Sequence, residues 1–152
     1  NHEELVSLIG IYEYMHNLYK HHFNGEDVSM LHKMQKINNI ISVHEEKIAN
    51  PLLEYLSSKK NFNLIGKNKI INKNRAPTIS FTVDNKSSKE VSEILVKNKI
   101  ATRNDNFYAW RCLKALEIDT KDGVIRISIV HYNTSEEVKK LIEALDKIKT
   151  MS

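Results

Sequence analysis

The sequence predicts an α+β fold, in which two long helices precede a small, mostly antiparallel sheet with helices packed on one face. Three observations lead to this expectation. Apolar residues recur at helical spacing as far as Leu56, short alternating segments follow, and two capping boxes begin further helices. We expect residues 1–60 to form a helical segment and residues 61–152 an α+β domain, the two together making one compact unit.

The first helix is expected over residues 3–22, because its apolar and aromatic residues fall three or four positions apart. They are Leu5, Leu8, Ile9, Tyr12, His16, Tyr19 and Phe23. A second helical pattern runs from Leu31 to Leu56 and contains Pro51. Either Asn50 caps a new helix that begins at Pro51, or one helix kinks there. The apolar stripe keeps its phase across Pro51, which favours the kink.

Short segments rich in β-branched residues predict the strands. They lie at residues 62–65, 78–83, 99–103 and 124–134. Ser87 with Glu90 and Thr134 with Glu137 form the two capping boxes. A further helix is expected over residues 107–116, with Cys112 buried in it as a small hydrophobic residue.

The composition excludes several classes of protein. A single cysteine allows neither an internal disulfide framework nor a thiolate zinc cluster, and it is typical of a cytoplasmic protein. The net charge of +4 is too small to indicate nucleic-acid binding, and no apolar run is long enough to span a membrane. The basic segment 67–75 is interpreted as a solvated loop or edge strand, because it has no aromatic residues on which bases could stack.

The segment 124–134 is the most informative. Ile125, Ile127 and Ile129 alternate onto one face of the predicted strand, which places Arg126 on the other. A buried arginine needs an anionic partner. Arg126 therefore either pairs with an acid of its own domain or reaches solvent from an edge strand, or it points into a cleft and binds a ligand carboxylate or phosphate.

Four segments, in order, carry a family resemblance: residues 75–82 (RAPTISFT), 100–103 (IATR), 106–109 (NFYA) and 126–138 (RISIVHYNTSEEV). The chain resembles the C-terminal, small domain of class V aminotransferases. The similarity is to the cysteine desulfurase-like and selenocysteine lyase-like branch of the pyridoxal-phosphate enzymes of fold type I.

The resemblance implies that Arg126 binds the carboxylate of an amino-acid substrate, with Arg103 and Tyr108 also at the substrate. It implies no catalytic residue here, because the position of the desulfurase cysteine is Tyr108. The lysine that holds pyridoxal phosphate is expected upstream of Asn1, in a large domain. Residues 1–60 would form the segment that leads out of that domain. We therefore expect a full-length homodimer that carries the cofactor, and a chain that binds none and is inactive alone. The reaction, lyase, transferase or epimerase, stays open.

The alternative is a free-standing, non-catalytic module of this family that binds an anion or a protein. Its docking surface would lie on the first helix, at Tyr12, Tyr19 and Phe23.

Overall fold

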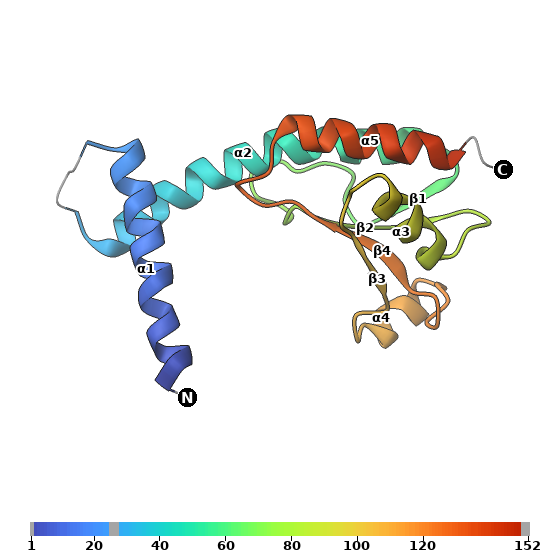
Figure 1. Ribbon diagram of the computed structural model, residues 1–152, viewed down its shortest axis with the longest axis horizontal. Helices are drawn as coiled ribbons and strands as arrows, with labels where there is room; N and C mark the ends of the chain where they lie inside the picture. Colours follow the sequence, from blue (N-terminus) through green and yellow to red (C-terminus); the bar gives the residue numbers. More distant parts are fainter. Residues whose placement is uncertain (1, 25–27, 150–152) are drawn as a thin grey trace. The chain divides into compact units, whose positions relative to one another are not determined.

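The computed structural model describes residues 2–24 and 28–149 (Figure 1). The helices in this part of the chain are α1 (His2–His22), α2 (Met30–Ser58), α3 (Ser88–Lys97), α4 (Trp110–Ala115) and α5 (Ser135–Lys149). The strands are β1 (Phe62–Ile65), β2 (Thr78–Val83), β3 (Arg103–Asp105) and β4 (Val124–Ser128). The chain divides into two compact units, one ending at His44 and the other beginning at Glu45.

In the first unit, α1 and the beginning of α2 bury one aromatic side chain. Tyr19 is 1% exposed, its ring stacks on that of Phe23 at 5.0 Å, and the ammonium of Lys33 lies 5.6 Å from the Tyr19 ring centroid. Most other apolar residues of α1 are exposed, among them Leu5, Val6, Leu8 and Ile9. The predicted helix is confirmed, but only a short part of its apolar stripe is buried.

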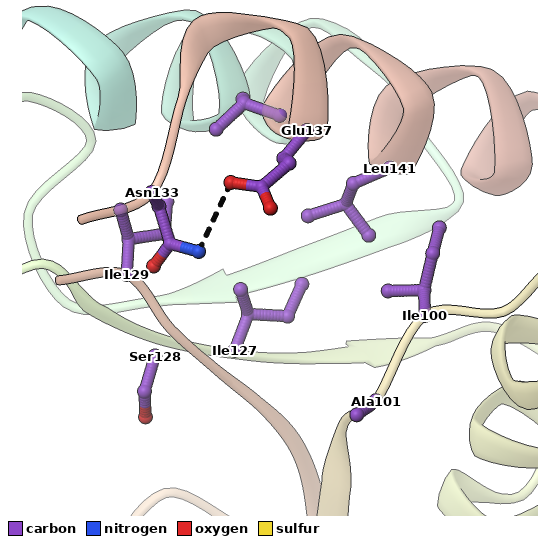
Figure 2. A pocket seen from close by; sticks show the side chains of 9 residues that line it. Ile100, Ala101, Ile127, Ser128, Ile129, Asn133, Glu137 and Leu141 are labelled. Carbon is purple, nitrogen blue, oxygen red and sulfur yellow. Dashed lines mark hydrogen bonds between the residues drawn. The ribbon is translucent and has the colours of Figure 1, made fainter.

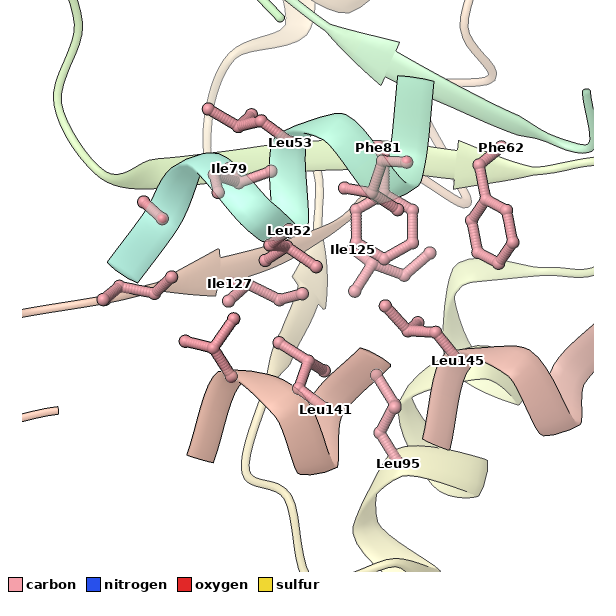
Figure 3. Close-up of a cluster of buried hydrophobic side chains, with 14 of the residues drawn as sticks. Leu52, Leu53, Phe62, Ile79, Phe81, Leu95, Ile125, Ile127, Leu141 and Leu145 are labelled. Atoms are coloured by element: carbon pink, nitrogen blue, oxygen red, sulfur yellow. The ribbon is translucent and has the colours of Figure 1, made fainter. Parts of the chain in front are cut away.

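The second unit is built on a four-stranded antiparallel sheet in the order β1-β2-β4-β3. Strand alternation places Ile79 and Phe81 of β2 beside Ile125 and Ile127 of β4 on one face. Apolar residues from α2, α3 and α5 meet this face in one core, as Figure 3 shows. They include Leu52, Leu53, Leu56, Leu95, Leu141 and Leu145. The α+β fold is confirmed.

Helix α2 is continuous through Pro51, so no new helix begins there. Asn50 is not a cap. Its side-chain oxygen accepts the backbone N–H of Ile70 at 2.8 Å, and its amide donates to the carbonyl of Ile70 at 3.1 Å. This clamp holds the buried Ile70 in the middle of the connection between β1 and β2. The segment 67–75 is therefore a loop and not an edge strand.

The predicted strand at residues 99–103 is wrong except at Arg103, because its first two residues complete the end of α3. Lys99 has a φ of 62°, its N–H donates to the carbonyl of Val96, and that of Ile100 donates to the carbonyl of Leu95. These bonds define a Schellman motif, which usually has glycine at the Lys99 position. The strand β3 therefore begins only at Arg103.

The predicted helix at 107–116 is also shorter in the structure. Phe107 and Tyr108 adopt positive φ angles of 52° and 60°, which no helix tolerates, and α4 begins at Trp110. Cys112 is exposed, so its predicted burial is wrong. Strand β4 ends at Ser128, where a turn leads into α5.

Both capping boxes are confirmed. The Ser87 N–H donates to the Glu90 carboxylate at 2.7 Å, and the Thr134 N–H donates to the Glu137 carboxylate at 2.8 Å. The helices described in the structure include none long and apolar enough to cross a membrane.

Candidate functional site

The sheet face opposite the core carries polar side chains. Strand alternation places Thr78, Ser80 and Thr82 of β2 on this face, together with Arg126 and Ser128 of β4. The register aligns Arg126 with Ser80 on one side and with Arg103 of β3 on the other. Ser80, Arg126 and Arg103 therefore form a row across the sheet, which we call the arginine row.

The two arginines of this row carry unbalanced charge. Neither guanidinium is paired with a carboxylate among residues 2–24 and 28–149. Asp105 lies on the same face of β3, but its carboxylate accepts the backbone N–H of Asn106 at 2.6 Å. Like charges directly opposite each other on paired strands are destabilising. An anion bound beside the row would relieve this repulsion.

Arg126 is partly buried in an unusual environment. Its guanidinium carbon lies 4.0 Å from the centroid of the Phe107 ring, which places a cation over an aromatic ring. Its Nε is buried and has no hydrogen-bond partner. A buried donor without an acceptor costs about 1–3 kcal/mol. A buried donor without a partner is rare in native proteins, so this nitrogen distinguishes Arg126 from an ordinary surface arginine.

The turn from Asn106 to Ala109 presents Phe107 and Tyr108. The Ala109 N–H donates to the Asn106 carbonyl at 2.8 Å, and the Tyr108 N–H donates to the Asn106 side-chain oxygen at 3.0 Å. Positive φ at both central positions is the signature of a type I′ turn, in which Asn and Gly are usual. The Tyr108 side chain is 96% exposed. Two bulky residues in these positions store backbone strain.

Asp122 and Gly123, the two residues just before β4, hold β3 and this turn in place. A Cβ on Gly123 would collide with the backbone of Asp105, so only glycine allows the approach. The Asp122 carboxylate accepts the N–H of Ser88 at 2.9 Å, at the N-terminus of α3. The Ser88 hydroxyl in turn accepts the side-chain amide of Asn104 at 3.3 Å. The sequence analysis did not find this network, because its residues lie far apart in the chain.

A small pocket opens at the C-terminal end of β4, under the first turn of α5 (Figure 2). Its volume is about 100 Å³, and apolar side chains such as Ile100, Ile127 and Leu141 line much of it. Glu137 lies at its rim, where it accepts the Asn133 amide at 3.2 Å. The backbone N–H of Thr134 and the Asn133 amide lower the pKa of Glu137. The carboxylate is therefore committed to capping α5 and is a poor general base.

The arginine row suits a carboxylate better than it suits covalent attachment of a cofactor. Strands β2, β3 and β4 contain no lysine, so this face offers no amine that could bond to an aldehyde. The described residues also contain no cluster of acids, histidines or cysteines that could hold a metal ion.

Comparison with known proteins identifies the family. Residues 25–141 match the family described as aminotransferase class V. The chain belongs to the class V aminotransferase family. Pyridoxal phosphate is the cofactor of this family.

Two curated relatives come from fungi. The chain is 38% identical over 109 residues to the aminotransferase-like protein FGM3 of Gibberella zeae and 33% identical over 105 residues to the cysteine desulfurase-like protein ustD of Aspergillus flavus. These matches cover 71% and 65% of this chain, but the chain spans only 27% and 23% of the two relatives.

Solved cysteine desulfurases share the fold. The apo enzyme from Thermococcus onnurineus has a TM-score of 0.63 at 25% identity, with 78% of this chain and 29% of that chain covered. CsdA from Escherichia coli has a TM-score of 0.62 at 18% identity, covering 82% of this chain and 27% of that chain. The second likeness speaks for the fold alone.

The structure brings Arg126 and Arg103 together as cross-strand partners. Tyr108 follows β3 in the turn beside them, and its side chain points into solvent. Phe107 was missed in the sequence analysis. Its position next to the predicted Tyr108 was the only available signal, because nothing in the sequence indicates that its ring lies on Arg126.

Proposed function

We propose that the arginine row binds the carboxylate of an amino-acid substrate in a pyridoxal-phosphate-dependent enzyme of the class V aminotransferase family. The observation that carries the proposal is that no carboxylate of the described residues pairs with the Arg126 guanidinium, which lies beside the cross-strand Arg103. A carboxylate can accept two parallel N–H bonds from one planar guanidinium, and the second cation adds attraction. Arg126 thus anchors the substrate, and Arg103 supplies additional positive charge.

Tyr108 distinguishes this chain from a persulfide-forming desulfurase. A thiolate is the nucleophile that attacks sulfur, and a phenol does not replace it. The one cysteine, Cys112, lies on α4 four residues further on and not in the turn. We therefore propose desulfurase-like lyase or transferase chemistry without a protein persulfide, with Tyr108 in contact with the substrate.

The cofactor supplies the electron sink for bonds at the amino-acid carbons in this family. We propose that residues outside the arginine row hold it, because the row has no lysine. The residues of the row then bind and orient the substrate. An unpaired cysteine is typical of a reducing environment, so we also propose a cytoplasmic location.

A titration with sodium acetate tests the carboxylate site. Arginine side-chain resonances are followed by NMR in the unchanged protein, in Arg126→Gln and in Arg111→Gln. Arg111 is an exposed arginine of α4, so the control variant has the same net charge as the test variant.

We expect acetate to shift the Arg126 Nε–H resonance in the unchanged protein and in Arg111→Gln. Acetate should produce no saturable shift on the arginine row in Arg126→Gln. Equal responses of the two variants would contradict the proposal, as would a response to chloride of the same size.

The exposed apolar residues of α1 favour a second candidate, a non-catalytic module that binds a protein. Leu5 and Val6 are 64% and 62% exposed. Tyr19, however, is buried and cannot take part in docking. Sedimentation of the unchanged protein and of a Leu5→Glu, Ile9→Glu double variant distinguishes the two candidates. Self-association of the unchanged protein that the variant abolishes favours the protein-binding module. A monomer in both cases disfavours it.

A further inference from the structure

Phe107 has a contact with Arg126 that the family resemblance does not supply. Arg126 comes from β4 and Phe107 from the turn after β3, and the guanidinium carbon lies 4.0 Å from the ring centroid. This is well within the distance of about 6 Å at which an aromatic ring attracts a cation. The contact joins the two elements that carry the arginine row.

The environment of Arg126 leaves one side of its guanidinium accessible. Its Nε is buried and unpartnered, whereas the residue as a whole is only partly buried. In the described part of the chain, neither terminal nitrogen is engaged by a carboxylate. A ligand can therefore reach this arginine end-on, through the two Nη groups, and not through the side that includes Nε.

A free arginine side chain has many rotamers, and binding must overcome the loss of this freedom. The Phe107 ring removes part of this freedom in advance, because the guanidinium lies over its face. The ring itself is held by the turn, in which Asn106 accepts the N–H of Tyr108 and donates its amide to the Thr120 carbonyl at 3.3 Å. The positive φ of Phe107 is the cost of this placement.

We infer that Phe107 is a positioning residue, which holds the Arg126 guanidinium so that its two Nη groups meet a substrate carboxylate end-on. The inference rests on the proposed carboxylate site. Phe107 touches no reacting atom and acts through Arg126.

The test compares four variants with the unchanged protein. Phe107→Leu keeps apolar volume but removes the ring, whereas Phe107→Tyr keeps the ring. Tyr132→Leu removes an exposed aromatic ring that does not contact Arg126, and it is the matched control. Arg126→Gln removes the proposed anchor. Backbone amide spectra show whether each variant folds, and Phe107→Met replaces Phe107→Leu if the latter does not.

Two quantities are measured by NMR: the solvent exchange rate of the Arg126 Nε–H and the dissociation constant for acetate. In Phe107→Leu we expect exchange at least several-fold faster and acetate binding weakened about two- to fivefold, the value of a surface cation–π contact. Phe107→Tyr and Tyr132→Leu should both resemble the unchanged protein.

The outcomes separate the two claims. If Phe107→Leu binds acetate as tightly as the unchanged protein, the positioning role is overturned while the carboxylate site stands. If acetate does not shift Arg126 in the unchanged protein, the proposed carboxylate site is overturned, and the positioning role with it. Weakening by Tyr132→Leu equal to that by Phe107→Leu would also overturn the role, because the effect would then not depend on the contact with Arg126.

Discussion

At the scale of single residues, Tyr108 combines a strained backbone with an exposed side chain. Its φ is 60° and its side chain is 96% exposed, so burial does not offset the strain. A left-handed conformation costs a residue with a Cβ about 1–2 kcal/mol. Strain that contributes nothing to packing is most often retained for function.

Replacing Tyr108 by glycine should therefore stabilise the protein. We expect the free energy of unfolding to rise by about 0.5–1 kcal/mol, since glycine relieves the left-handed strain but loses more chain entropy on folding. Urea denaturation measures the change. Tyr132→Gly is the matched control, because Tyr132 is 75% exposed and has no positive φ, and it should give no gain. A loss of stability in Tyr108→Gly would show that the side chain has a structural role.

At the scale of residues, local alternation was enough to place Arg126 on the face of the strand opposite Ile125 and Ile127. Its role at a substrate stays a prediction, and only the register places Arg103 opposite it. The Phe107 contact was not predictable, because it joins a turn to a strand through three-dimensional packing. Cys112 was misjudged because the turn at Phe107 and Tyr108 delays the beginning of α4 and changes which of its sides faces solvent.

At the scale of elements, the position of β3 depends on Gly123, the residue just before β4. Gly123 has a φ of 74°, and any Cβ there would collide with the backbone of Asp105. The strands β3 and β4 pair through only three residues each, so a small displacement would break the pairing of Arg103 with Arg126. The glycine is thus required for the geometry of the arginine row.

The substitution Gly123→Ala should destabilise the protein by about 2–4 kcal/mol, because steric overlap adds to an unfavourable φ. Gly10→Ala is the matched control. Gly10 lies in α1, where an added Cβ would meet no atom within 4 Å, and alanine should gain up to about 1 kcal/mol there. Circular dichroism during urea denaturation measures both. A neutral Gly123→Ala would show that β3 can move without cost.

The two capping boxes give the stability a defined pH dependence. Hydrogen bonds from Ser87 lower the pKa of Glu90 below its ordinary value of 4.5, and those from Thr134 and Asn133 lower that of Glu137. A carboxyl whose pKa is lower in the folded state stabilises the fold above its unfolded pKa, and this stability is lost as pH falls through the folded pKa.

We therefore expect the free energy of unfolding to fall as pH decreases below about 4.5, and the double variant Glu90→Gln, Glu137→Gln to show a weaker fall. Glutamine keeps the capping shape but not the charge, so the double variant should be less stable than the unchanged protein at pH 7 and approach it at acid pH. The matched control, Glu93→Gln with Glu136→Gln, removes two exposed carboxylates outside the capping bonds. The same slope in the capping variant and the control would contradict this account.

Elements were predictable where the hydrophobic period and the caps agree. Helices α3 and α5 begin as expected, because each has both signals, and strand β2 begins as expected from its alternation after Pro77. Residues 99–102 were misassigned because Lys99 occupies a position that glycine usually marks. The sequence therefore lacked the signal that α3 ends here, and the residues that follow α3 resembled a strand.

At the scale of the whole molecule, the two faces of the sheet differ: helices cover one face, and the proposed binding site lies on the other. Helices α2, α3 and α5 cover the apolar face in a single core, while the opposite face carries the arginine row. The fold class followed from the sequence because patterning decides which face is buried. The row itself required the strand order β2-β4-β3, which the sequence alone does not determine.

Linkage between acetate and stability tests the carboxylate site most directly. Urea denaturation is measured in sodium acetate and in sodium chloride at equal ionic strength and neutral pH, for the unchanged protein, Arg126→Gln and Arg111→Gln. A ligand that binds only the folded state stabilises it by about 1.4 kcal/mol at ten times its dissociation constant. The account predicts this gain in acetate for the unchanged protein and Arg111→Gln, and none for Arg126→Gln. The same acetate effect in all three proteins would contradict it.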